Sequence, residues 1–378
     1  MTSNQNNLNM PLSEKRIIIS GGGTGGHIFP AIAIADALKS IEPGINILFV
    51  GAKGRMEMEK VPAAGYPIEA LWISGLQRKL APKNLLFPLK LIHSSLRARS
   101  IIKKFAPDAV VGVGGYASGP TVKAAAALGI PTILQEQNSY PGITNRMLAR
   151  KARKICVAYP GMEKFFPSSK LIITGNPIRA DIVHANAKRA EALEFFGLSG
   201  GKPVILAVGG SLGALTINQS LHQGLKEIAD AGIQLIWQTG KSYTEQAAAA
   251  ALPFEKAGIR QHTFITRMDL AYAAADIVIS RAGAIAISEL CVTGKPSILV
   301  PSPNVAEDHQ TKNAMALTKA GAAIMVRDSE APGKLVNIAI ELAGNKQKRS
   351  DLSANILLLG KENAAAEIAE IVLSCIVK

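Results

Sequence analysis

Residues 16–27 read Arg-Ile-Ile-Ile-Ser-Gly-Gly-Gly-Thr-Gly-Gly-His, a β-branched run followed by a glycine-rich loop. The run at 16–20 predicts a buried parallel strand, and the apolar stretch that follows at 27–40 predicts a helix. The glycines allow a tight turn whose backbone N–H groups can approach a ligand closely. Such a strand, loop and helix N-terminus form a phosphate site, because free amides and the helix dipole both favour an anion. His27 adds a side chain suited to proton transfer near neutral pH.

The glycine loop is also compatible with a dinucleotide-binding fold, because three of its glycines match G-x-G-x-x-G. A nicotinamide site requires an acidic residue about 20 residues further on, at the end of the second strand, to bind the ribose. The second strand is predicted at 45–50, and no acidic residue follows it at that place. Lys53 and Arg55 could instead bind the 2′-phosphate of NADP, so an NADP-dependent oxidoreductase remains an alternative.

The length of 378 residues predicts two domains, and a hydrophobic fraction of 48% supplies enough apolar side chains for two cores. Cys156, Cys291 and Cys375 lie far apart, which indicates neither a disulfide framework nor a zinc site and fits a reducing cytoplasm. The first 13 residues are polar and lack the features of a signal peptide. No uninterrupted apolar run reaches the length of a membrane span.

The net charge of +14 is concentrated in the N-terminal half. Residues 1–180 hold 23 Lys and Arg against 9 Asp and Glu, whereas residues 181–378 hold 19 of each. Residues 70–107 contain no acidic side chain, and the region 72–104 within them mixes basic with bulky apolar residues. This mixture favours an anionic membrane surface over nucleic acid, which would require more aromatic side chains for base stacking. The alternative is that 84–105 is an amphipathic helix whose apolar face lies in the core.

Short apolar strands alternate with helical stretches along the chain, which predicts an α/β fold with parallel sheets. The second half opens like the first, with a strand at 204–208 and a glycine loop at 209–214, so two Rossmann-like domains that face a cleft are the simplest architecture. A break is predicted near 175–179. Further strands are predicted at 109–113, 131–135, 154–157, 171–174, 233–238, 260–265, 276–279, 297–300 and 322–326. Further helices are predicted at 84–105, 118–128, 142–151, 188–196 and 362–376.

A second group of candidate ligand residues follows the strand predicted at 276–279. Residues 281–284 form a turn into a helix, whose N-terminus can hold a diphosphate. Glu289 lies in the first turns of that helix and can accept hydrogen bonds from a ribose diol, with a simple dipole-favoured acid as the alternative. The polar run at 308–313 begins another helix and offers groups that could recognise a sugar. No two aspartates lie two positions apart, so amides and helix dipoles are expected to stabilise a leaving diphosphate.

Taken together, these segments make the chain resemble the MurG family, the bacterial transferases that add N-acetylglucosamine (GlcNAc) from UDP-GlcNAc to lipid I. Seven segments carry the resemblance, in order, across residues 16–320. They are 22–30 (Gly-Gly-Thr-Gly-Gly-His-Ile-Phe-Pro), 112–120 (Gly-Val-Gly-Gly-Tyr-Ala-Ser-Gly-Pro), 136–138 (Glu-Gln-Asn), 175–179 (Gly-Asn-Pro-Ile-Arg), 209–214, 281–289 and 308–310 (Asp-His-Gln). Any one of them is weak, and the seven in order are specific.

The resemblance implies a GT-B glycosyltransferase that moves GlcNAc, with inversion, to the C4 hydroxyl of MurNAc in undecaprenyl-diphospho-MurNAc-pentapeptide (lipid I), giving lipid II for peptidoglycan. Residues 14–179 would bind the acceptor and the membrane, and residues 180–361 would bind UDP-GlcNAc. The C-terminal helix 362–378 is a candidate to pack on the first domain. The resemblance implies no cofactor, no metal and no nucleic acid. It implies a peripheral location at the cytoplasmic face of the inner membrane, through the basic and apolar region 72–104.

The resemblance also assigns catalytic roles. The C4 hydroxyl would attack the anomeric carbon while UDP leaves from the opposite face, and His27 would accept the proton as general base. The alternative is that His27 only orients the loop. Tyr116 and Glu136 would face the reacting sugars as further catalytic residues, beside Asn138.

The donor-binding roles fall mainly on the second domain. The substrate-binding residues that the resemblance implies are Thr24, Gly25, Gly26, Asn138, Arg179, Ser211, Ile265, Ala284, Ile285, Ala286, Ile287, Ser288, Glu289 and Gln310. Arg179 and Ser211 would meet the diphosphate, and the Ile265 backbone would contact the uracil. Gln310 would contact GlcNAc hydroxyls, a role that His309 could share. Two other classes of function stay open: a non-enzymatic protein that binds membrane or nucleic acid through its basic half, and a related transferase for glycolipids or antibiotics.

Overall fold

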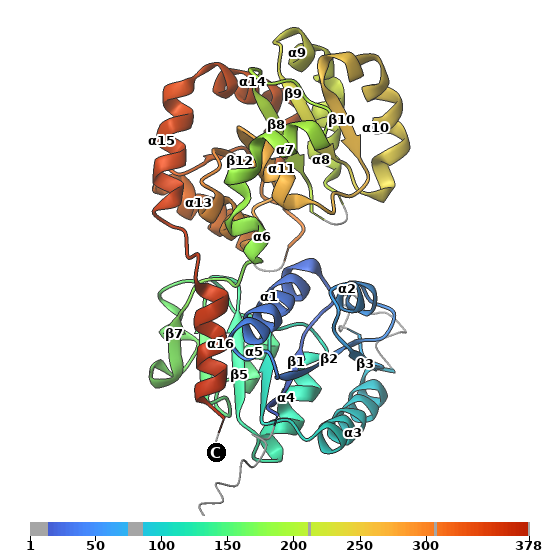
Figure 1. Ribbon diagram of the computed structural model, residues 1–378, viewed down its shortest axis with the longest axis vertical. Helices are drawn as coiled ribbons and strands as arrows, with labels where there is room; N and C mark the ends of the chain where they lie inside the picture. The colour runs from blue at the N-terminus through green and yellow to red at the C-terminus, as the bar shows by residue number, and fades with distance from the viewer. Residues whose placement is uncertain (1–13, 75–85, 211–212, 306–307, 377–378) are drawn as a thin grey trace, which may run out of the picture.

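The computed structural model describes residues 14–74, 86–210, 213–305 and 308–376 (Figure 1). Within these residues the chain forms two fully parallel β-sheets, one in each half. Each sheet has a separate hydrophobic layer on either face, covered by helices. The predicted α/β fold with two Rossmann-like domains is therefore confirmed.

The N-terminal sheet has seven strands in the order β3-β2-β1-β4-β5-β6-β7. Their bounds are β1 Arg16–Ser20, β2 Asn46–Ala52, β3 Ile68–Leu71, β4 Ala109–Gly112, β5 Thr132–Glu136, β6 Lys154–Val157 and β7 Leu171–Ile173. Successive side chains of a strand point to opposite faces, so Ile17 and Ile19 lie in one layer and Ile18 in the other. The strand order reverses between β1 and β4, and parallel sheets bind ligands at the carboxyl ends of strands at such a switch point.

Helices cover both faces of this sheet. One layer contains α1 (Gly25–Ile41) and the last helix of the chain, α16 (Ala364–Ser374), which lie side by side in Figure 1. The other layer contains α3 (Phe87–Phe105), α4 (Ser118–Ala127) and α5 (Ile143–Leu148). The short helix α2 (Glu57–Ala63) follows β2. The chain therefore returns to its N-terminal sheet after completing the C-terminal one.

The C-terminal sheet has six strands in the order β10-β9-β8-β11-β12-β13. Their bounds are β8 Val204–Val208, β9 Gln234–Gln238, β10 Ile259–His262, β11 Ile277–Ser280, β12 Ser297–Leu299 and β13 Ile324–Met325. The helices around it are α6 Ala180–Val183, α7 Arg189–Phe195, α8 Leu215–Gln223, α9 Leu225–Asp230, α10 Thr244–Ala251, α11 Met268–Ala274, α12 Ala284–Thr293, α13 His309–Lys319, α14 Ala331–Gly344 and α15 Lys346–Leu357. Its switch point lies between β8 and β11.

Most of the predicted strands and helices agree with the structure to within two or three residues, and the differences have local causes. Helix α1 begins at Gly25 rather than at 27, which places two glycine amides in its first turn. Helix α3 begins at Phe87, with a proline in its first turn, rather than at 84. Helix α2 and strand β3 were not predicted, because the first is short and contains Pro62 and the second, Ile68–Leu71, is a half-exposed edge strand.

Candidate active site

A cavity of about 530 Å³ lies at the carboxyl ends of β1, β4 and β5, at the switch point of the N-terminal sheet. Its lining residues come from the loops that follow these strands and from the start of α13 in the other domain. They are Gly22, Gly23, Thr24, His27, Arg55, Gly114, Gly115, Tyr116, Glu136, Asn138, Tyr140, Pro141, Gly142, Ile143, Thr144, Asn145 and His309. The three residues predicted to be catalytic thus lie on one cavity, and a C-terminal side chain helps to close it.

Two glycine loops meet at the floor of this cavity. Gly115 has φ +82°, and a Cβ atom on it would overlap the carbonyl of Gly22 in the first loop. Only glycine allows the two loops to approach so closely. The ring of His27 lies against the second loop, where a Cβ on Gly114 would be 2.9 Å from its Cδ2 and Nε2 atoms. The two loops therefore enclose the imidazole.

His27 is poised as a neutral imidazole. Burial lowers its pKa, and a hydrogen bond to the Gly22 backbone and the negative charge of Glu57 partly oppose that fall. The hydroxyl of Thr24 lies 3.3 Å from Nδ1 of the ring. A histidine whose pKa is lowered is largely unprotonated at neutral pH, so it can accept a proton.

The first glycine loop differs from the predicted phosphate site at Gly23. Its N–H donates to Oε2 of Glu57 at 2.9 Å, so a carboxylate of the chain itself occupies this amide and a phosphate cannot use it. Gly25 and Gly26 lie in the first turn of α1, where N–H groups have no intrahelical acceptor. The anion-binding capacity of the loop therefore lies at 25–26. Glu57 was missed because an acid in the first turn of a helix is an ordinary sequence feature.

Glu136 lies at the end of β5 and is almost fully buried. Its carboxylate accepts hydrogen bonds from Nδ2 of Asn145 at 2.9 Å and from the backbone N–H groups of Gly142 and Asn138 at 3.1 Å. Burial raises the pKa of Glu136, and these hydrogen bonds oppose the rise. Glu136 therefore holds the loop between β5 and α5, whereas Tyr116, 49% exposed, lies at the open rim.

Buried amides connect the two domains beside the cavity. Nδ2 of Asn176 donates to the Gln137 carbonyl at 3.2 Å and to Oγ of Ser288 on α12 at 3.0 Å. Nε2 of Gln135 donates to Oδ1 of Asn176 at 3.1 Å. Ser139 and Asn313 make a further contact between the domains, 3.4 Å long. The end of β5 is thus tied to the start of α12.

The predicted donor residues gather around α12. Oε2 of Glu289 accepts a hydrogen bond from the Tyr272 hydroxyl at 2.9 Å. Burial raises the pKa of Glu289 to about 7, against the hydrogen bond from Tyr272 and the positive charge of Arg179. The Arg179 guanidinium lies 5.7 Å from the centre of the Phe29 ring on α1 and pairs with Asp181. Arg179 therefore lies between the two domains, within electrostatic range of Glu289.

The remaining residues predicted to bind the donor differ in whether their polar groups already have partners within the chain. The Ile265 N–H donates to Oε1 of Gln238 at 2.8 Å, and Oε1 of Gln310 accepts from the Ser302 N–H at 2.9 Å. Within 284–289, the Ile287 side chain packs in the core and its N–H donates to the Gly283 carbonyl at 2.9 Å, so neither is open to a ligand. Ser211 lies outside the described residues.

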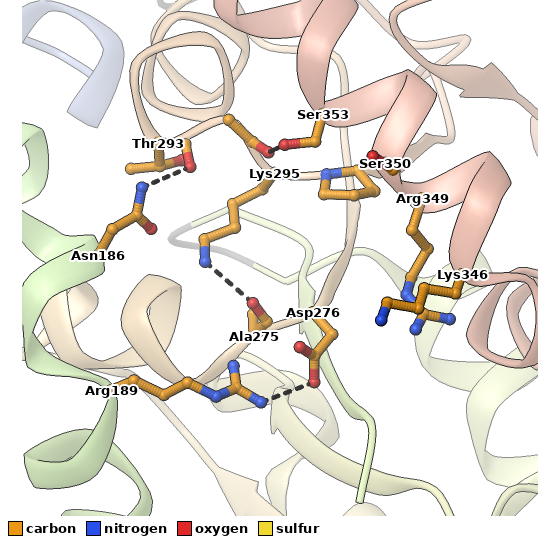
Figure 2. Close-up of a pocket in the computed structure, with 12 residues that line it drawn as sticks. Asn186, Arg189, Ala275, Asp276, Thr293, Lys295, Lys346, Arg349, Ser350 and Ser353 are labelled. Atoms are coloured by element: carbon orange, nitrogen blue, oxygen red, sulfur yellow. Dashed lines mark hydrogen bonds and ion pairs between the residues drawn. The ribbon is translucent and has the colours of Figure 1, made fainter. Parts of the chain in front are cut away.

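A second cavity, of about 370 Å³, lies in the C-terminal domain at the amino ends of β11 and β12 (Figure 2). It is therefore at the opposite edge of the C-terminal sheet from the loops that follow its strands. Four basic side chains line the cavity, and three of them bind carbonyl groups at helix ends. Arg189 and Lys295 donate to Ala274 and Ala275 at the end of α11, and Arg349 donates to carbonyls at the end of α14. Basic side chains stabilise helix C-termini in this way, so the cavity has a structural explanation.

Family models and relatives match nearly the whole chain. The model of the glycosyltransferase family 28 N-terminal domain matches residues 17–157, and that of the glycosyltransferase family 28 C-terminal domain matches residues 204–371. The UDP-N-acetylglucosamine--N-acetylmuramyl-(pentapeptide) pyrophosphoryl-undecaprenol N-acetylglucosamine transferase of Cytophaga hutchinsonii is 55% identical over 353 residues, 93% of this chain and 95% of the relative. The enzyme of the same name from Porphyromonas gingivalis is 55% identical over 356 residues, 94% of each chain.

Solved structures show the same architecture. The crystal structure of Acinetobacter baumannii MurG has a TM-score of 0.74 and 29% identity, and the match covers 95% of this chain and 99% of that one. A UDP-GlcNAc 2-epimerase from Neisseria meningitidis bound to UDP-GlcNAc has a TM-score of 0.66 at 14% identity, covering 95% and 100%. The second likeness concerns the fold alone.

Proposed function

The chain belongs to glycosyltransferase family 28, and we propose that within this family it is a UDP-GlcNAc–dependent transferase that converts lipid I to lipid II. The enzyme moves GlcNAc from UDP-GlcNAc to the C4 hydroxyl of MurNAc in undecaprenyl-diphospho-MurNAc-pentapeptide, with inversion, in peptidoglycan synthesis. The observation that carries this conclusion is the 55% identity, over more than nine tenths of both chains, to relatives named for that reaction.

The acceptor sugar fits the cavity of the N-terminal domain, with residues 14–179 and helix α16 as the acceptor domain. A neutral imidazole has one donor and one acceptor nitrogen. Besides the hydrogen bond to the Gly22 backbone, the ring of His27 has the Thr24 hydroxyl 3.3 Å from Nδ1, and the C4 hydroxyl would take the place of that exposed threonine hydroxyl. As the oxygen bonds to the anomeric carbon, His27 takes the hydroxyl proton. Tyr116 and Asn138 line the same cavity, where they can orient the two sugars.

UDP-GlcNAc fits the C-terminal domain, residues 180–361, at the switch point between β8 and β11. The α12 N-terminus offers amides for the diphosphate, and Glu289 offers a carboxylate to the ribose diol. Arg179 lies within electrostatic range of Glu289, and we assign the free amides of Gly25 and Gly26, at the start of α1, to the same diphosphate. When the bond from the anomeric carbon to the diphosphate oxygen breaks, the electron pair stays with UDP, and these positive groups stabilise it.

Helix α3 supports a peripheral contact with the cytoplasmic face of the inner membrane. Its inner face, including Ala98 and Ile102, lies in the core, as the alternative interpretation of 84–105 expected. Its outer face exposes Leu89 (59%), Ile92 (59%) and Leu96 (66%) among basic residues. Exposed apolar side chains beside cations suit an interface with anionic lipid. Residues 75–85 of the predicted region lie outside the described residues, and no helix that the structure describes has the length and apolarity to span a membrane.

The experiment that tests the function measures transfer of labelled GlcNAc from UDP-GlcNAc to a lipid I analogue, in detergent with excess EDTA. We expect a lipid II product that does not require added metal. Binding of UDP-GlcNAc without transfer to any lipid I analogue would overturn the acceptor assignment. Failure to bind UDP-GlcNAc, with binding of NADPH instead, would overturn the donor assignment.

A further inference from the structure

Glu57 is the first residue of α2, yet its side chain is buried, with 1% of its surface exposed. Its Oε2 accepts the N–H of Gly23 in the first glycine loop at 2.9 Å, and its Oε1 accepts the N–H of Ala52 at the end of β2, also at 2.9 Å. A single carboxylate thus joins three segments: the loop after β1, the end of β2 and the start of α2.

Two glycines leave the space that this carboxylate occupies. Gly22 has φ +145°, and a Cβ on it would overlap the carboxylate of Glu57. A Cβ on Gly51, in β2, would lie 2.6 Å from Cγ of Glu57. Side chains at either position would displace the carboxylate, so the local backbone is shaped around it. Glu57 does not line the cavity described above, so it acts through the loop that it holds.

The same carboxylate lies close enough to His27 to change its proton affinity. Its negative charge raises the pKa of the ring, against the larger lowering by burial. A charge that raises the pKa of a base stabilises the protonated form. When His27 accepts a proton during the reaction, the imidazolium forms beside this charge.

We propose that Glu57 is a positioning residue for the transfer reaction: its buried carboxylate fixes the loop that carries His27 and stabilises the imidazolium formed when the acceptor hydroxyl is deprotonated. The inference rests on the proposed function for the identity of the reaction. The proton passes from the C4 hydroxyl to His27 while the new glycosidic bond forms and UDP leaves. Glu57 neither gives nor takes a proton in this step.

The test compares three variants. Glu57→Gln removes the charge and turns an NH2 group toward one of the two backbone amides. Glu57→Asp keeps the charge but is one methylene too short to reach both amides. Glu59→Gln is the matched control, since Glu59 lies on the same helix but is exposed and paired with Lys60. All three variants leave the other titratable residues that line the cavity unchanged: Arg55, Tyr116, Glu136, Tyr140 and His309.

For Glu57→Gln we expect kcat to fall by about tenfold, less than the 10²–10⁴-fold typical of losing the base itself, while KM for UDP-GlcNAc stays within about threefold. The acid limb of the pH profile of kcat/KM should move to lower pH, because loss of the charge lowers the pKa of His27. Glu57→Asp should keep the position of the limb with a smaller loss of kcat. NMR titration of labelled His27 should show its pKa lowered only in Glu57→Gln.

Two results would overturn the proposal: a kcat of Glu57→Gln within twofold of that of Glu59→Gln, or a folded Glu57→Gln protein with unchanged His27 titration. If Glu57→Gln does not fold, Glu57→Asp carries the test, and a kcat equal to the control would overturn it. The NMR titration needs no substrate. If the wild-type protein failed to transfer GlcNAc, the proposed function would be contradicted. The NMR titration would still test the effect of Glu57 on the pKa of His27.

Discussion

Asn176, in the segment that follows β7, donates a hydrogen bond to the hydroxyl of Ser288 on α12, with 3.0 Å between Nδ2 and Oγ. The amide of Asn176 is buried and also bonds Gln135 and the Gln137 carbonyl on the N-terminal side. One side chain thus links the loop beside the cavity proposed for the acceptor to the helix proposed to bind the donor. It is one of the contacts, with that between Ser139 and Asn313, that set the relative position of the two sites.

Asn176→Ala should destabilise the protein by about 1–3 kcal/mol, because the buried partners on Gln135 and Gln137 lose their hydrogen bonds. Thermal unfolding checks this as a lowered Tm. Ser288→Ala is the matched comparison and should cost less, because Nδ2 of Asn176 keeps its hydrogen bond to the Gln137 carbonyl and Oδ1 keeps that from Gln135. Equal Tm values for wild type and Asn176→Ala would show that the amide network contributes nothing.

His27→Ala should lower kcat by roughly 10²-fold or more, because the acceptor hydroxyl loses the base that we propose for it. Binding of UDP, measured by calorimetry, should be nearly unchanged, since the base faces the acceptor. In the wild type, kcat/KM should fall at acid pH as His27 becomes protonated, with the midpoint below the ordinary histidine pKa of 6.5 because burial lowers it. A loss of less than tenfold in His27→Ala would leave the residue only an orienting role.

Glu289 should make UDP binding depend on pH. Its pKa of about 7 means that the carboxylate form, which accepts hydrogen bonds from ribose hydroxyls, increases from pH 6 to pH 8. Glu289→Gln should weaken UDP binding by about tenfold at pH 8, the effect of one hydrogen bond to a charged group. UDP itself titrates in this range in both proteins, so the ratio of the two dissociation constants is the informative quantity. A ratio that stays constant from pH 6 to pH 8 would argue against the assignment.

The Glu289 carboxyl should also affect the stability of the fold, with a pH dependence opposite to that expected for UDP binding. Its pKa in the folded chain lies above the ordinary value of 4.5, so the folded state binds more protons than the unfolded state between pH 4.5 and about 7. The contribution of this group to stability is therefore largest at low pH and declines as the pH rises through that window. Denaturant unfolding at pH 5 and pH 8 should show that Glu289→Gln gains stability relative to wild type at the higher pH.

Leu96→Ser should weaken binding to anionic vesicles by up to about tenfold, because a leucine contributes about 1.5–3 kcal/mol when fully buried and a leucine in the lipid interface is only partly buried. Leu252→Ser in the C-terminal domain is the matched control, since both leucines are 66% exposed. Co-sedimentation with vesicles at several salt concentrations measures the effect. If both variants bind as tightly as wild type, α3 is not the membrane contact.

The sequence predicted most of the sheet and the place of the cavity because their signals are local. Runs such as 16–20 are β-branched and uninterrupted, and glycine loops at the carboxyl ends of parallel strands meet at one edge whatever the details of packing. Strand β3 lacks such a run. Glu57 and Asn176 could not be recognised, because their roles depend on partners 34 and 112 residues away in the chain.

The placement of α16 has a consequence for how the chain acquires its structure during synthesis. Ile368 and Val372, both fully buried, complete the hydrophobic layer of the N-terminal sheet with residues that are synthesised after the whole C-terminal sheet. The usual order, in which the N-terminal domain folds first, is therefore reversed for the final step. The described strands of the C-terminal sheet are all made before α16, while the first-made domain keeps an uncovered apolar face until α16 has been made. A nascent chain of this protein should thus need protection at its beginning, and a stop codon before residue 364 should damage the domain farthest from it in sequence.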